Sequence, residues 1–345
     1  MSDGLPRRPL GPARVAAVSF GMGILLVAVC CASMLLGTAE ISIDQVRGLF
    51  RSSEDIGAGY ARFILLQIRL PRIILAALVG FALALGGVVF QALLRNPLAD
   101  PFILGVSSGS AFGAIVGILL GFSPGVGVPA MSFAGALSTL VLLLSFGMRR
   151  IATESSTILL TGVIINAFFS AMIMFFLSVC ADAKLHSMLF WLYGDLSQTS
   201  YSHASLIGAV LLVSSLLLYS FANRLNLLTA GEDSALRMGL DVAKTKLVLL
   251  LIVSLMIGTV VAFSGLIGFV GLIVPHLARM VFGSDHRLLI PVAALGGASF
   301  LVMADTLART LIAPSELPVG VISAFVGAPF FLYLLVGKGG QWSRS

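Results

Sequence analysis

Long uninterrupted runs of apolar residues recur from one end of this 345-residue sequence to the other. A helix needs about 20 apolar residues to cross the hydrocarbon core of a bilayer, and about ten runs of that length follow one another. Charged residues make up only 10% of the chain, whereas soluble proteins carry roughly a quarter. Because so few charges cannot cover a soluble protein of this length, lipid must face much of the surface. We therefore predict an all-α, polytopic membrane protein with about ten transmembrane helices.

The apolar windows form a single transmembrane domain over residues 1–345, with no second domain. Gly268, Gly271 and Pro275 interrupt one window, so two alternatives stay open there: a full span, or a broken or re-entrant helix. Two further segments, at residues 184–196 and 223–246, are too polar to span and are predicted to form helices at the surface. The predicted spans are residues 15–38, 71–94, 102–121, 127–148, 157–180, 205–222, 247–264, 266–283, 289–312 and 319–336.

The distribution of basic residues favours both chain termini on the cytoplasmic side. With that orientation, 14 of the 21 lysines and arginines lie in internal segments, as the positive-inside rule expects. Most of the exceptions cluster just before the second window, where Arg69 and Arg72 stand. An excess of positive charge on the outer side indicates a function for this cluster beyond membrane orientation.

No enzyme motif is visible in the sequence. Residues 337–339 lack the earlier glycine and the Ser or Thr of a phosphate-binding loop. The four histidines show no ligand spacing, and Cys30, Cys31 and Cys180 are expected to act as small apolar residues. We therefore predict no catalytic residue, no metal site and no cofactor bound by this chain. If ATP is used, another subunit must bind it.

Small residues recur along the third window. Gly105, Gly109, Gly113 and Gly117 stand every fourth residue, so they would form one flat strip on a helix. Such a strip allows another helix to approach closely. We expect the strip to serve packing within the bundle.

Seven motifs in chain order are more specific than any single feature above. They are RLPR at 69–72, QALLRNPLADP at 91–101, LGVSSG at 104–109, GFVGLIVPH at 268–276, ADTLAR at 304–309, ELPVG at 316–320 and GAP at 327–329. Together they resemble the FecCD-type permeases, the membrane subunits of importers for ferric siderophores, haem and cobalamin. The resemblance covers nearly the whole chain and implies the fold of a type II ABC importer permease.

The same resemblance implies an assembly and a location. The expected assembly contains a second copy of this chain, two cytoplasmic ATPase subunits and a periplasmic or extracellular substrate-binding protein. The ATPase subunits would use ATP and Mg, and this chain would bind neither. The expected location is the bacterial inner (cytoplasmic) membrane, with membrane lipid around the chain and no nucleic-acid partner.

The resemblance also assigns roles to particular residues. The assigned docking residues for the binding protein are Arg69, Arg72 and Arg309, those of the cytoplasmic gate are Asn96, Leu98, Ser155 and Ser156, and those that couple to the ATPase are Gly231, Glu232, Asp233, Ser234, Ala235 and Leu240. Asp305 stands four residues before Arg309, so an ion pair within one helix competes with docking at that position. An ordinary cytoplasmic loop competes with coupling for residues 223–246.

The fifth window carries a polar stripe. Gly162, Asn166 and Ser170 stand four residues apart and so share one helix face. A polar stripe within a span usually faces the bundle interior or a pathway. We predict that these three residues line a pathway, and plain helix packing is the alternative.

Two other classes of membrane protein compete with an ATP-driven importer. A secondary transporter driven by an ion gradient usually places ionisable residues near the membrane midplane. Here the predicted spans are nearly free of them, and Asp305 has Arg309 as a partner. A membrane enzyme is disfavoured because no carboxylate pair or histidine cluster lies near a membrane face. Substrate-stimulated ATP hydrolysis separates the importer from the secondary transporter.

Overall fold

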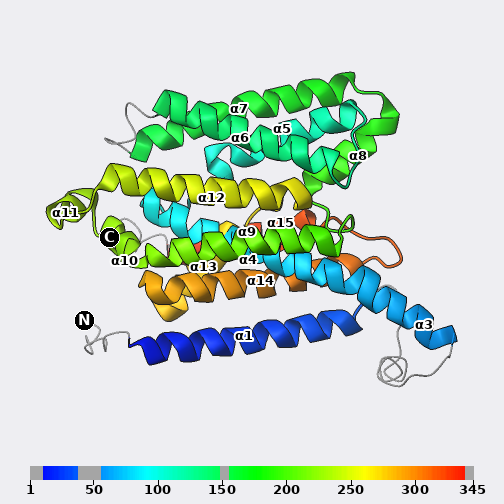
Figure 1. Ribbon diagram of the computed structural model, residues 1–345, viewed down its shortest axis with the longest axis horizontal. Helices are drawn as coiled ribbons and strands as arrows, with labels where there is room; N and C mark the ends of the chain where they lie inside the picture. The colour runs from blue at the N-terminus through cyan, green and yellow to red at the C-terminus, as the bar shows by residue number, and fades with distance from the viewer. Residues whose placement is uncertain (1–10, 38–55, 148–154, 339–345) are drawn as a thin grey trace.

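The structure, a computed structural model, describes residues 11–37, 56–147 and 155–338, and every regular element in these ranges is a helix. Long helices run side by side, with α10 and α11 at one end of the bundle and α3 and α8 at the other (Figure 1). The elements are α1 Pro12–Leu35, α3 Ile56–Phe63, the π-helical η1 Ile64–Arg69, α4 Leu70–Leu93, the 3-10 helix η2 Pro101–Leu104, α5 Val106–Leu119, α6 Gly127–Gly147, α7 Ser155–Val179, α8 Asp182–Tyr193, α9 Tyr201–Ser220, α10 Ala222–Thr229, α11 Glu232–Arg237, α12 Val242–Ser264, α13 Val270–Phe282, α14 His286–Thr310 and α15 Val319–Lys338.

The described residues contain seven helices that are long and apolar enough to cross a membrane, and three shorter apolar helices. The long ones are α1, the continuous run Gly59–Leu93 that contains α4, and the helices α6, α7, α9, α12 and α14. The shorter ones are α5, α13 and α15. Each predicted window holds one of these helices. The prediction of an all-α membrane chain with about ten hydrophobic helices is therefore confirmed.

The starts of the second and third helices differ from those of the predicted windows. The second apolar helix begins at Ile56 and not at residue 71, because α3, η1 and α4 follow one another without a break. Pro71 lacks an N–H, but it comes just after the π-helical turn, where the N–H of Leu70 donates to the carbonyl of Leu65. The third begins at Val106 and not at residue 102, because η2 forms first and Gly105 then takes a φ of 81°.

Helix α4 lies at the centre of the bundle and is buried along nearly its whole length, mainly against α14. The glycine strip of the third window does serve packing. A Cβ on Gly109 would lie 2.6 Å from the carbonyl oxygen of Gly135, and one on Gly113 would lie 2.1 Å from that of Met131. Both carbonyls belong to α6, so α6 is the helix that approaches the strip at backbone distance.

The window at 266–283 is broken at its start. Helix α13 begins only at Val270, after Gly265 and Phe269 have taken positive φ angles of 66° and 70°. Its 13 residues rise about 20 Å, which is less than the roughly 30 Å of hydrocarbon that a full span must cross. Of the two alternatives for this window, the structure favours the broken helix.

The two polar segments are helical. Residues 184–196 correspond to α8, which is mostly exposed, and residues 223–246 contain α10 and α11. The last residues of the second segment were misassigned, because α12 already begins at Val242. Asp241 caps that helix by accepting a hydrogen bond from the N–H of Lys244, so the span starts earlier than hydropathy alone suggests.

Candidate functional site

A groove of about 500 Å³ lies where η2, the start of α5, the middle of α7 and the broken start of α13 meet. Its walls are mostly apolar, with a few polar groups between them. The lining residues are Leu98, Asp100, Phe102, Ile103, Ser107, Ser108, Asn166, Ser170, Ile173, Leu266, Gly268, Phe269 and Leu272. The structure thus brings two predicted pathway residues, Asn166 and Ser170, together with one predicted gate residue, Leu98.

Gly162, the third predicted pathway residue, does not line this groove. It is buried, and a Cβ added to it would lie 2.8 Å from Cα of Leu104 and 3.0 Å from the carbonyl oxygen of Ile103. The sequence placed it in the pathway because it shares a helix face with Asn166. The turn at η2 covers that part of the face, so Gly162 serves close packing and Asn166 faces the groove.

The predicted gate residues stand at different places. Asn96 shapes the chain before η2, since its Oδ1 accepts the N–H of Leu98 at 2.9 Å. Leu98 is exposed and lines the groove. Ser155 and Ser156 are the first residues of α7, but their side chains lie outside the described residues. Their role in a gate stays a prediction.

Two groove residues were not singled out from the sequence. Asp100 caps η2, with Oδ1 accepting the N–H of Phe102 at 2.9 Å. Burial raises the pKa of its carboxyl group to about 6, and the bond from Phe102 opposes that rise. The hydroxyl of Ser107 is buried and makes no hydrogen bond to any described residue. An Asp directly before Pro is a helix-start signal that would have pointed to Asp100.

The three predicted docking arginines gather at the end of the bundle where α3 and α8 lie, but all three are buried. Nε of Arg72 lies 2.9 Å from Oδ1 of Asp305, and Nε of Arg309 lies 3.1 Å from Oδ2 of the same carboxylate. Arg69 donates to the carbonyl of Met34 at 2.8 Å. The alternative of an ion pair between Asp305 and Arg309 is confirmed, and docking stays a prediction.

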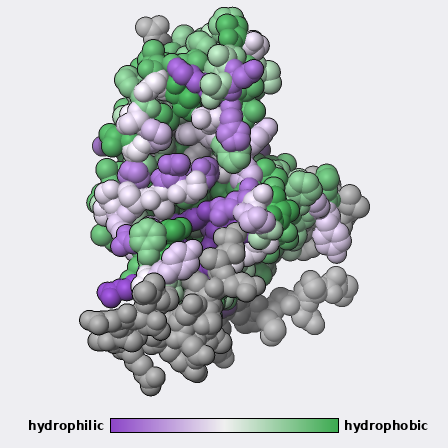
Figure 2. All heavy atoms as spheres, turned by 90° about the vertical axis from the view of Figure 1, so that its right-hand side faces the viewer, coloured by the Kyte–Doolittle hydropathy of each residue, from purple (hydrophilic) through white to green (hydrophobic). Residues whose placement is uncertain are grey.

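Glu316 is the exposed member of this cluster. Its Oε2 lies 2.6 Å from Nη1 of Arg72, and 38% of its side chain is exposed, against 1% for Asp305. Glu316 belongs to the ELPVG motif, but nothing in the sequence assigns it a role. Seen from this end of the bundle, hydrophilic side chains gather in the middle of the surface with hydrophobic ones around them (Figure 2).

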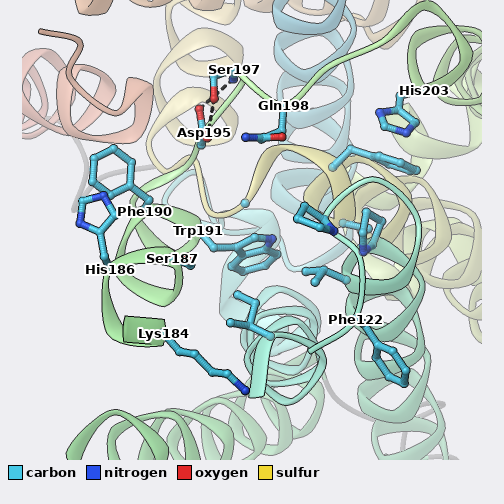
Figure 3. Close-up of a pocket in the computed structure, with 17 residues that line it drawn as sticks. Phe122, Lys184, His186, Ser187, Phe190, Trp191, Asp195, Ser197, Gln198 and His203 are labelled. Carbon is cyan, nitrogen blue, oxygen red and sulfur yellow. Dashed lines mark hydrogen bonds between the residues drawn. The ribbon is translucent and has the colours of Figure 1, made fainter. Parts of the chain in front are cut away.

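A second cavity, of about 530 Å³, opens at the same end between the α5–α6 turn, α8 and the outer ends of α9 and α12. Figure 3 shows Lys184 and His186 on one side of it and His203 on the other. The ring of His186 stacks on Phe190 with centroids 4.4 Å apart. Lys184 donates to the carbonyl of Leu119 at 2.6 Å. In the described part of the chain, no three His, Cys, Asp or Glu residues lie together as a metal site would require.

The predicted coupling residues lie at the opposite end, in α11 and the turns beside it. Asp233 and Ser234 are exposed, and Gly231 precedes α11 with a φ of 122°. Glu232 turns inward, where its Oε1 lies 2.7 Å from Nζ of Lys246. Leu240 is half-buried and donates its N–H to the carbonyl of Ala235.

One coupling prediction is corrected. Ala235 was expected on the surface, where a small side chain would allow a partner to approach, but it is fully buried against its own subunit. The apolar side chains that do face outward are Leu236 and Met238, which are 56% and 68% exposed. Nothing in the sequence distinguishes these two residues, because apolar residues are common throughout this chain.

Comparisons with known proteins identify the family of this chain. The sequence model of the FecCD transport family matches residues 25–337. The cobalamin import system permease protein BtuC of Halobacterium salinarum is 39% identical over 94% of this chain and 96% of its own. The hemin transport system permease protein HmuU of Yersinia pestis is 40% identical over 93% of this chain and 95% of its own. A solved ABC transporter assigned to the metal-chelate type, in an inward-facing conformation, has a TM-score of 0.83 and 34% identity over 94% of this chain and 99% of its own. This chain therefore belongs to the FecCD transport family.

Proposed function

We propose that this chain is the membrane permease subunit of an ATP-driven importer of metal chelates. The observation that carries the proposal is the match of nearly the whole chain, in sequence and in fold, to permeases whose names state transport of cobalamin or hemin. The cargo class is a large metal chelate, such as a ferric siderophore, haem or cobalamin.

The chain works as a homodimer in the bacterial inner (cytoplasmic) membrane, with both termini in the cytoplasm. The groove lined by Asn166 and Ser170 is one half of a passage that a second copy completes. Its largely apolar walls offer few hydrogen bonds, which suits a cargo that must be released on the other side. Leu98, at the groove, and Asn96, which shapes the turn before it, contribute to a cytoplasmic gate with Ser155 and Ser156.

Partners bind at the two ends of the bundle. Two ATPase subunits, which bind ATP and Mg, rest against the exposed surface of α11, where Leu236 and Met238 stand among polar residues. A substrate-binding protein docks at the other end, near the cluster of Arg69, Arg72 and Arg309. This chain binds no cofactor itself.

The experiment that tests the proposal is reconstitution of the chain with its ATPase and binding protein in sealed vesicles. ATP hydrolysis should rise when loaded binding protein is present, and uptake should continue after an ionophore removes all ion gradients. Uptake that stops with the ionophore and needs no ATP would identify a gradient-driven secondary transporter, the alternative class.

A further inference from the structure

An ion pair joins the inner end of α12 to α11. Lys246, in the second turn of α12, is one of the largest fully buried side chains of the protein, with 1% exposed. Its Nζ lies 2.7 Å from Oε1 of Glu232, the first residue of α11. A buried ammonium group is tolerated only beside such a partner, because desolvation of an unpaired charge costs several kcal/mol. The ion pair therefore fixes α11 to α12.

The short helix α11 has little freedom to move by itself. The N–H of Leu240 donates to the carbonyl of Ala235, and the N–H of Gly239 donates to that of Leu236. With Gly239 at a φ of 82°, these two bonds form a Schellman motif. Ala235 is buried beneath the helix. A force on the exposed face of α11 thus reaches α12 through a turn that is closed by hydrogen bonds.

The outer end of α12 contacts α8 and the residues after it through backbone atoms. The N–H of Asp195, two residues after α8, donates to the carbonyl of Ser264, the last residue of α12, at 2.9 Å. A Cβ on Gly265 would lie only 2.2 Å from the carbonyl oxygen of Trp191 in α8. The two backbones therefore touch, and no side chain separates them. Helix α8 in turn forms one wall of the outer cavity in Figure 3.

We infer that α12 transmits movement as a rigid body from the exposed face of α11 to α8, which forms the outer wall, and we call this role the relay. Glu232 and Lys246 are the positioning pair that connects α11 to α12. The inference rests on the proposed function, because an ATPase must supply the movement at α11. The 23 residues of α12 span about 34 Å, so one unbroken helix joins the two ends of the bundle. Alternating access requires such a connection, since the two faces must open in turn.

The test uses the permease–ATPase complex in lipid nanodiscs, with Cys30, Cys31 and Cys180 replaced by alanine. Ser187→Cys on the exposed face of α8 reports the outer wall through its labelling by a membrane-impermeant thiol reagent. Labelling is compared between nucleotide-free and nucleotide-trapped complexes. The double variant Glu232→Gln/Lys246→Met removes the ion pair without leaving a single buried charge, so the bundle should fold.

We expect nucleotide to change the labelling rate of Ser187→Cys in the parent, and the change to shrink about fivefold or more in the double variant, a loss at the lower end of typical coupling between sites. The reciprocal exchange Glu232→Lys/Lys246→Glu should restore it. Ser315→Cys, an exposed position outside α8, is the control whose labelling should stay the same in both permeases.

Three results would overturn the relay. They are an unchanged nucleotide effect in the double variant, no nucleotide effect in the parent, and loss of the ATPase from the double variant alone, which would make the pair part of the ATPase surface. Failure of the parent itself to bind an ATPase is a different result, because it would refute the proposed function and not the relay alone.

Discussion

Arg72 and Asp305, which stand 233 positions apart in the sequence, form a buried ion pair of 2.9 Å that joins α4 to α14 at their outer ends. Asp305 also binds Arg309, so one carboxylate holds two guanidinium groups. The cluster of Arg69, Arg72 and Arg309 therefore stabilises the packing of α4 against α14, and it is also a candidate docking surface. The two roles can be separated, because the members of the cluster differ in exposure.

We expect Asp305→Ala to destabilise the fold severely. It would leave Arg72 and Arg309 as buried cations without their shared carboxylate, and breaking a buried pair in this way typically costs about 3–5 kcal/mol. The measurement is the unfolding temperature in detergent together with the yield of folded protein. Glu316→Gln is the matched control, since Glu316 is far more exposed and its loss should cost about 1 kcal/mol or less. Equal stability of the two variants would contradict the structural role.

Glu316→Gln should also strengthen docking of the binding protein. Glu316 occupies the outward-facing side of Arg72, where an acidic residue of a partner would bind. The substitution removes the negative charge that competes for Arg72, and the gain in docking should be largest at low salt, because exposed charges are screened beyond about 10 Å at 0.1 M. Binding kinetics over a salt series would measure this. Unchanged or weaker binding at low salt would count against a docking role for Arg72.

We expect Leu236→Asp and Met238→Asp to release the ATPase subunits while the bundle stays folded. Both side chains are exposed on the coupling segment, so a charge there disturbs only the surface that a partner must cover. Co-purification of the ATPase is the measurement, with folding checked by size-exclusion chromatography. Arg224→Asp, an exposed change in α10 and outside α11, serves as the control. Full retention of the ATPase would place the interface elsewhere.

The sequence predicted the helices well and the partners of individual side chains poorly. Apolar windows locate spans because each helix must match the thickness of the bilayer, a constraint that acts on local sequence. Spacing also predicted that a helix packs closely on the glycine strip of α5, and it offered the pair of Asp305 with Arg309 as an alternative to docking. Both depend on residues three or four apart. The Arg72–Asp305 pair is set by how two distant helices pack, and no local pattern encodes it.

The same limit explains the corrected site residues. Helical spacing put Gly162 on one face with Asn166, but only the tertiary fold shows that η2 covers that part of the face. Ala235 lies in a polar segment, which suggested exposure, although the short helix has a buried side of its own. Segment polarity reports the average environment, whereas a single residue is placed by what packs against it.

The raised pKa of Asp100 predicts how the stability of the fold depends on pH. An unfolded Asp titrates near pH 3.9, whereas burial moves the folded value to about 6. The folded state therefore holds the proton more tightly, so the contribution of Asp100 to stability is present below about pH 4 and is lost as the pH rises through 6. Asp100→Asn, which keeps the acceptor for Phe102, should become more stable than the parent over this range, by up to about 3 kcal/mol at pH 7. Unfolding temperatures at pH 4, 5, 6 and 7 measure the difference. A constant difference would contradict burial of the charge.

One prediction distinguishes pathway lining from helix packing for the residues of α7 at the groove. Asn166 and Ser170 line the groove, so cysteines at these positions should react with a small water-soluble thiol reagent once Cys30, Cys31 and Cys180 are replaced. Labelling should differ between nucleotide-free and nucleotide-trapped complexes, because the passage opens to one side at a time. Ile164→Cys, an exposed position on the opposite side of α7 from Asn166, should show no nucleotide dependence.

Gly162→Cys should behave differently from both groove variants. Its new Cβ would lie 2.8 Å from Cα of Leu104, a distance that forces the backbone of η2 to shift. We expect a fall in folded yield, and Gly162→Ala should show the same loss with a smaller side chain. Overpacking of this kind typically costs about 1–3 kcal/mol. If Gly162→Cys instead folds normally and labels as fast as Asn166→Cys, the passage extends past η2 and the turn does not close this part of α7. Normal folding without labelling would show that η2 yields to the added atom, which would weaken the packing role without placing Gly162 in the passage.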